Sequence, residues 1–107
     1  MNDHILRYSI VHADEESSYI PVGIFDLGLK PHQVGLYCYL ISKIDKTDRA
    51  IVSLNQMASK MGSKRTLIDN LRKLEEMGLI KKVSRTGDDG ANLSNAYIVY
   101  NPDILGV

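Results

Sequence analysis

Residues 53–80, SLNQMASKMGSKRTLIDNLRKLEEMGLI, predict two short helices that are joined by a tight turn and lead directly into a basic strand. Ser53 and Gln56 have the spacing of a capping box, in which each side chain accepts a backbone N–H of the other residue at a helix N-terminus. Gly62 can adopt the positive φ that ends the first helix, and Ser63 can cap the second. A pair of helices around a glycine turn is therefore expected.

The second helix of this pair, expected from Ser63 to Met77, has one apolar stripe and one polar face. The stripe consists of Leu67, Leu71, Leu74 and Met77. The other face carries Lys64, Arg65, Ile68, Asp69, Arg72 and Lys73. Gly78 follows as the residue that ends the helix.

The run SKRTLIDNLRKLEEMGLIKK, residues 63–82, resembles the recognition helix and first wing strand of bacterial winged helix-turn-helix DNA-binding domains. The upstream run YIPVGIFDLGLKPHQVGLYCYL, residues 19–40, resembles the lead-in of such domains in phage and plasmid replication proteins, including DnaD-like initiators. Asn70 stands where that family usually has an apolar residue, and Ile68 where it often has a polar one. The resemblance implies an α+β fold, mainly α, with a three-helix core and a β-hairpin wing.

Length and charge agree with one DNA-binding domain. The chain has 107 residues, which is enough for a single core, and its one cysteine cannot form an internal disulfide. The formal net charge is zero, but residues 1–30 carry −3 and residues 63–87 carry +4. Positive charge is thus concentrated on the expected recognition helix and wing, where it can meet phosphates.

Three segments divide the chain. Residues 1–20 are expected to be an extended arm, because ILRYSIVH at 5–12 is rich in β-branched and aromatic residues. This arm either folds back on its own domain or pairs with a second copy of the chain, and both alternatives remain open. Residues 21–101 are expected to form the winged domain. Residues 102–107 are expected to be a tail that leads to a further domain if the chain is part of a longer protein.

The remaining elements support the helix pair. Pro31 suits the first turn of a helix expected to end at Ile44, and Gly35 inside it predicts a close approach by neighbouring backbone. A brief helical turn is expected at 24–27 and a short strand at 50–52. Two wing strands are expected at 79–85 and 96–101, joined by the loop TGDDGANLSN.

The resemblance implies that helix 63–77 enters the major groove of double-stranded DNA. Arg65 is the best candidate for bidentate reading of a guanine edge, because its planar fork matches two acceptors. Asp88 and Asp89 repel phosphates, so the wing tip is expected to stay outside the DNA. The expected DNA-binding residues are Ser53, Asn55, Gln56, Ser59, Ser63, Lys64, Arg65, Thr66, Ile68, Asp69, Arg72, Lys73, Lys81, Lys82 and Arg85.

No enzyme activity, cofactor, metal or small-molecule substrate is expected. His4, His12 and His32 lie in three separate local settings, and one cysteine excludes the usual zinc patterns. Cys38 lies on an apolar helix, where a buried structural role is favoured over a nucleophile. The apolar runs end well short of the ~20 residues of a membrane span. A cytoplasmic protein is expected.

Three functions remain open at this stage. The favoured one is DNA binding in a phage or plasmid replication initiation protein, with a homodimer or higher self-association engaging paired half-sites. The first alternative is a transcription regulator, since the same fold serves both processes. The second is a protein–protein assembly module without strong DNA binding, for which the exposed Ile68 would be suited.

Overall fold

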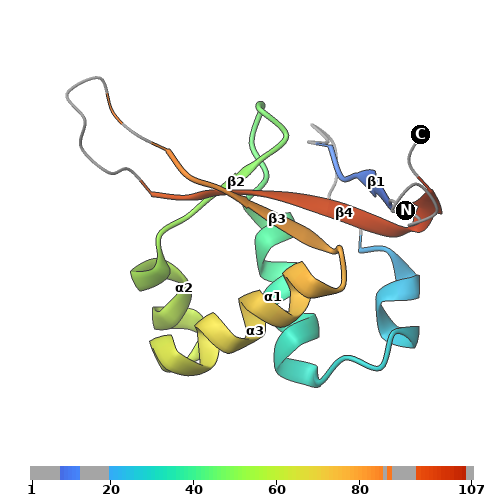
Figure 1. Cartoon of the computed structure of the whole chain (residues 1–107), viewed down its shortest axis with the longest axis horizontal. Helices are drawn as coiled ribbons and strands as arrows, with labels where there is room; N and C mark the ends of the chain where they lie inside the picture. The colour runs from blue at the N-terminus through green and yellow to red at the C-terminus, as the bar shows by residue number, and fades with distance from the viewer. Residues whose placement is uncertain (1–7, 13–19, 86, 88–93, 106–107) are drawn as a thin grey trace, which may run out of the picture.

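The helices of the computed structural model pack against one side of an antiparallel sheet (Figure 1). The structure describes residues 8–12, 20–85, 87 and 94–105. The elements in chain order are β1 (Tyr8–Ile10), the 3-10 helix η2 (Val22–Asp26), α1 (Pro31–Ser42), β2 (Ala50–Ile51), α2 (Leu54–Met61), α3 (Lys64–Glu76), β3 (Ile80–Val83) and β4 (Ala96–Leu105). The expected α+β class with a predominance of helix is confirmed.

β4 is the strand against which every other described strand pairs. β3 runs antiparallel to it with Lys82 opposite Tyr97, and β2 places Ala50 opposite the same tyrosine. β3 and β2 therefore lie on opposite edges of β4. β1 pairs farther along β4, where Ile10 lies opposite Tyr100.

The core lies between the helices and this sheet. α1 contributes Leu36, Tyr37 and Leu40, which are fully buried. The hydroxyl of Tyr37 donates a hydrogen bond of 2.7 Å to the carbonyl oxygen of Tyr100, which fixes α1 to β4. A buried tyrosine needs such an acceptor, because an unpaired hydroxyl in the core is costly.

Asn70 on α3 accepts a hydrogen bond from a residue of α1. Gln33 is only 8% exposed, and its Nε2 lies 3.5 Å from Oδ1 of Asn70. The Gln33 Oε1 atom accepts the backbone N–H of Lys30 at 2.9 Å, so the same side chain also caps α1. A polar residue is accommodated on the inner side of α3 because α1 supplies a buried amide opposite it.

The turn between α2 and α3 is the one that the sequence predicts. Ser53 Oγ accepts the N–H of Gln56 at 3.0 Å, and Gln56 Oε1 accepts the N–H of Ser53 at 2.9 Å. Gly62 has φ of 103°, and Ser63 Oγ accepts the N–H of Thr66 at 3.2 Å. The capping box, the glycine turn and the second cap are confirmed.

Some boundaries differ from the expected ones. α1 ends at Ser42 and not at Ile44, because the N–H of Ile44 bonds to Ile41 and the residue forms a bridge with Ala50. β3 is shorter than 79–85, and β4 extends past Asn101 to Leu105. β4 is long because β1 pairs with its second half, which no local pattern indicates.

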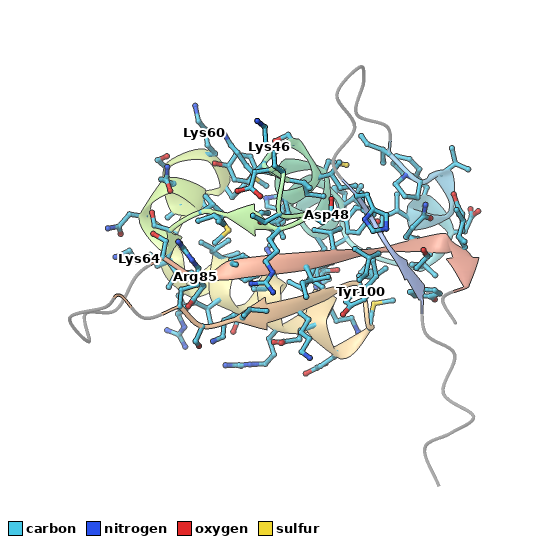
Figure 2. All side chains as sticks on the ribbon, turned by 90° about the horizontal axis from the view of Figure 1, so that it is seen from above. Lys46, Asp48, Lys60, Lys64, Arg85 and Tyr100 are labelled. Carbon is cyan, nitrogen blue, oxygen red and sulfur yellow. The ribbon has the colours of Figure 1, made fainter. Side chains whose placement is uncertain are left out.

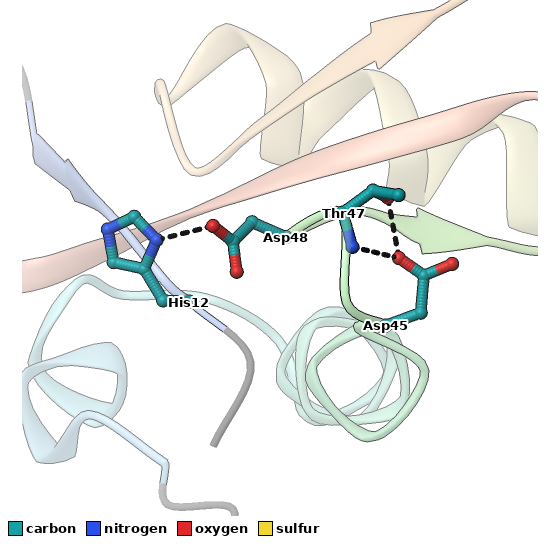
Figure 3. Close-up of polar contacts among 4 residues, drawn as sticks. All are labelled: His12, Asp45, Thr47 and Asp48. Carbon is teal, nitrogen blue, oxygen red and sulfur yellow. Dashed lines mark hydrogen bonds and ion pairs between the residues drawn. The ribbon is translucent and has the colours of Figure 1, made fainter. Parts of the chain in front are cut away.

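The described part of the N-terminal arm folds back on its own chain. Val11 is buried, and its N–H donates to the carbonyl of Val99 at 2.7 Å. His12 Nδ1 lies 2.8 Å from Oδ2 of Asp48 in the α1–β2 turn (Figure 3). In the same turn Asp45 Oδ1 accepts the Thr47 hydroxyl at 2.5 Å and the Thr47 N–H at 2.8 Å, and these two hydrogen bonds lower the pKa of Asp45. Of the expected strand 5–12, residues 5–7 lie outside the described residues.

Among the described residues, no backbone of a neighbouring element lies within 4 Å of the point that a Cβ of residue 35 would occupy, so the expectation for Gly35 was wrong. A Cβ at this position would lie 3.4 Å from Cε of Met61, which is the flexible end of an α2 side chain. Gly78 differs, because its φ of 73° is a conformation that favours glycine whatever the space around it.

Two alanine substitutions should therefore change stability in opposite directions. Gly35→Ala should raise the free energy of unfolding by ~0.5–1 kcal/mol, because alanine is the better helix former and fits the space. Gly78→Ala should lower it by ~1–2 kcal/mol, because the side chain strains a left-handed residue. Urea unfolding of both variants measures the difference. A destabilised Gly35→Ala would mean that Met61 cannot move aside.

Candidate nucleic-acid interface

α3 divides into a buried side and an exposed side, as expected. Leu67, Leu71 and Leu74 are buried against the core. The residues expected to meet DNA all lie on the exposed part of the helix surface: Lys64, Arg65, Thr66, Ile68, Asp69, Arg72 and Lys73. The apolar stripe thus holds α3 against the domain while its charged side chains face solvent.

The arginines of α3 have few partners within the described part of the domain that would compete with a bound anion. Arg65 forms no hydrogen bond or ion pair with any other described residue. Arg72 Nη1 lies 3.8 Å from Asp69 Oδ1, but both side chains are about two-thirds exposed, at 66% and 67%. A pair in such contact with water contributes little energy. Both arginines can therefore exchange solvent for an anion at small cost.

The predicted hydroxyl and amide ligands are engaged within their own helices. The Ser59 hydroxyl donates to the Gln56 carbonyl at 2.7 Å, and the Ser63 hydroxyl donates to Thr66 Oγ1 at 3.0 Å. Ser53 and Gln56 cap α2, as described above. Asn55 is exposed on the first turn of α2. Among the uncharged residues predicted to bind DNA from α2 and its cap, Asn55 therefore makes the fewest hydrogen bonds to other described residues.

The hairpin of β3 and β4 brings further cations to the same end of the molecule. Lys81 and Lys82 are exposed on β3, and Arg85 follows it. The guanidinium of Arg85 donates from Nη1 to the Ser94 carbonyl at 3.1 Å, so it joins the two arms of the hairpin beyond the last strand pair, on the loop side. Figure 2 shows Lys64 and Arg85 toward the same end of the long axis. Asp88 and Asp89 lie outside the described residues.

An open groove separates α3 from the hairpin. It encloses about 230 Å³ and is lined by Leu54, Ile68, Leu71, Arg72, Glu75, Ile80, Lys82, Asn95 and Tyr97. We call these residues the α3–hairpin groove. Ile68 and Arg72 face this groove from α3, and Lys82 faces it from β3. Of the predicted helix and wing residues, Ile68, Arg72 and Lys82 therefore meet at this groove, whereas Lys81 and Arg85 do not line it.

Several residues that line the α3–hairpin groove were not among the site residues predicted from the sequence. Glu75 Oε2 accepts the backbone N–H of Lys82 at 3.3 Å, which places a carboxylate between the helix and the strand. Burial raises the pKa of the Tyr97 phenol, a hydrogen bond from Asn95 lowers it, and the charge of Glu75 raises it further. Tyr97 lies opposite Lys82 in the strand register, and this register places it beside the groove. This register could not be predicted from a local sequence pattern, because it depends on how the two strands pair.

Other kinds of site find no support in the described ranges. Among those residues, no group of three or more His, Cys, Asp and Glu side chains is arranged to hold a metal ion. No helix in this part of the chain is long and apolar enough to cross a membrane.

Comparison with known proteins identifies the helical part of the fold. A protein-family model described as a helix-turn-helix domain matches residues 27–80, which is half of the chain. The match begins before α1, includes α2 and α3, and ends at the first residue of β3. No curated protein and no solved structure matches the chain. The expected helix-turn-helix arrangement is confirmed by the matched family.

The Cys38 thiol provides a test of the structural role expected for it. Cys38 is partly buried on α1, and this burial raises the pKa of its thiol. The thiolate fraction at about pH 8 should thus be smaller in the folded protein than in the unfolded chain, whose thiol has a pKa of ~8.5. Iodoacetamide should alkylate the folded protein more slowly than the urea-unfolded chain. Equal or faster alkylation of the folded protein would indicate an activated thiol.

Proposed function

Because the chain belongs to the helix-turn-helix domain family, we propose that it binds double-stranded DNA through α3 and the β3–β4 hairpin. The observation that carries this proposal is the set of exposed cations on α3 and β3, on both sides of the α3–hairpin groove. A surface of this kind attracts phosphates and releases their counterions.

In the proposed complex, α3 lies in the major groove with its N-terminal half nearest the bases. Arg65 is exposed near the start of α3 and reads a guanine edge through its planar guanidinium. The hairpin acts as a wing, and Lys81 and Lys82 contact the sugar–phosphate backbone. Lys64, Arg72 and Lys73 neutralise phosphates on the two sides of the DNA major groove.

The opposing carboxylates limit this attraction. Asp69 lies beside Arg72, and Glu75 accepts the N–H of Lys82. Each carboxylate repels phosphates at close range, so affinity for arbitrary DNA is reduced. Specific contacts from α3 must then supply a larger share of the binding free energy.

We further propose a role in the initiation of phage or plasmid replication. The support for it is the resemblance of residues 19–40 to the lead-in of replication-protein domains. Transcription regulation is the alternative, since one fold can serve both processes. A bound site within a replication origin would favour the first role, and one within a promoter the second. A protein that acts on bacterial DNA in either role works in the cytoplasm.

Self-association is the second proposed property, and the exposed apolar surface favours it. Large apolar side chains are exposed on η2 and at the end of β4: Val22 is 74%, Phe25 63% and Ile104 52% exposed. The N–H of Gly23 donates to Oδ1 of Asp103 at 2.9 Å, which joins these two elements. Neighbouring exposed apolar side chains on a small domain indicate an interaction surface. Two copies joined there could bind paired half-sites.

Two charge substitutions test the DNA-binding proposal. Arg65→Ala should weaken binding to a selected site by ~1–3 kcal/mol and relax one base position, because a bidentate contact is lost. Lys82→Ala should weaken all sequences alike and reduce the salt slope by ~1, because one phosphate contact is lost. Fluorescence anisotropy with labelled duplexes over a salt series measures both effects.

Lys46→Ala is the matched control for these variants. Lys46 is exposed in the turn after α1, away from α3, and its loss removes the same charge (Figure 2). Its affinity should stay close to that of the unchanged protein. No binding at low salt by the unchanged protein would refute the DNA-binding proposal and favour the assembly role. Equal losses for Lys46→Ala and Lys82→Ala would refute the proposed orientation.

Self-association can be tested independently of DNA. Phe25→Ser should shift sedimentation velocity profiles toward the monomer, because it removes a large apolar group from the proposed contact. Ile68→Ser, which changes an exposed apolar side chain on α3, should leave the oligomeric state unchanged. A monomer at every concentration of the unchanged protein would contradict the proposal, whatever its affinity for DNA.

A further inference from the structure

We infer that Ile68 is a specificity-determining residue of α3 and contacts the 5-methyl group of a thymine in the bound site. This inference rests on the proposed DNA-binding function and assigns one position within it. Ile68 is 40% exposed, whereas the other large apolar side chains of α3, which are Leu67, Leu71 and Leu74, are buried. The core of the domain therefore does not require this isoleucine.

The position of Ile68 on α3 is central to the charged face. Lys64 and Arg72 lie four residues before and after it, so the three side chains share one flank of the helix. When these two cations neutralise phosphates on either side, the side chain between them is held against the floor of the DNA groove. Arg65, one turn earlier, can then read a neighbouring base.

The chemistry of an isoleucine limits what it can read. Its side chain has no hydrogen-bond donor or acceptor, so the donor and acceptor pattern of a base edge gives it no favourable contact. The apolar feature that the major groove presents is the C5-methyl group of thymine. The groove beside Ile68 includes the apolar Leu54 as well as the charged Arg72 and Lys82. A thymine methyl group that contacts Ile68 is removed from water where the two apolar groups meet.

A domain that reads DNA by hydrogen bonds alone would be better served by a polar residue here. A β-branched residue on an exposed helix position also lowers helix propensity slightly relative to leucine or lysine. Ile68 thus gains neither core packing nor helix stability from its exposed position. Contact with an apolar group of the DNA explains its chemistry.

The test uses deoxyuridine, which differs from thymidine only by this methyl group. A preferred duplex is first selected from random sequences, and each thymine in it is then replaced singly by uracil. At one position the replacement should weaken binding by the unchanged protein about fourfold, the effect of one buried methyl group. The same replacement should have no effect on Ile68→Ala, because the partner of the methyl group is already gone.

Two further variants keep the result interpretable. Ile68→Leu retains an apolar side chain and should keep the sensitivity to uracil. Ile10→Ala removes a side chain of similar exposure, 39%, from β1 and should also keep it. Circular dichroism melting shows whether each variant is folded. Equal uracil sensitivity in Ile68→Ala and the unchanged protein, or binding that responds to no uracil, would overturn this inference while leaving DNA binding intact. Absence of any DNA binding would overturn both.

Discussion

The pairing of β4 with three other strands is the constraint on which the rest of the domain depends. Tyr97 is held between Lys82 of β3 on one edge and Ala50 of β2 on the other, and Tyr100 continues the strand opposite Ile10 of β1. β2 leads directly into α2, so its register on β4 also sets where the helix pair begins. The hydroxyl of Tyr37 then fixes α1 to the carbonyl of Tyr100. Each helix is thus positioned with reference to a single strand.

The geometry of the α3–hairpin groove follows from this arrangement. Buried leucines and the Gln33–Asn70 contact fix the inner side of α3, so its polar side can only face the hairpin and solvent. The β3 register brings Lys82 within hydrogen-bonding distance of Glu75 through its backbone. A slip of one residue would turn the other face of β3 toward α3 and remove this contact. The charged surface is therefore a consequence of strand register as much as of the helix sequence.

Local patterns predicted most of the helical part of the fold. The Ser53–Gln56 capping box, Gly62 and the leucine stripe of α3 each depend on residues within one or two turns, and the structure confirms them. Long-range pairings were not predictable in the same way. β1 lies beside the end of β4 although some ninety residues separate them in the chain, so no periodicity indicates the contact. The α3–hairpin groove likewise required the register of two strands. Sequence therefore identified the cations of the proposed site but not the groove between them.

The distribution of charge determines what kind of DNA binding such a domain can support. The whole chain has a formal net charge of zero, so it generates little attraction for DNA at long range. Fields from the exposed cations of α3 and β3 act within a Debye length, which is ~8 Å at physiological salt. Asp69 and Glu75 weaken these fields further, since they lie among the same cations. Phosphate attraction alone would then hold the domain weakly on any sequence. The free-energy difference between a specific site and other DNA must come from short-range contacts, and these depend on the fixed position of α3 against the sheet.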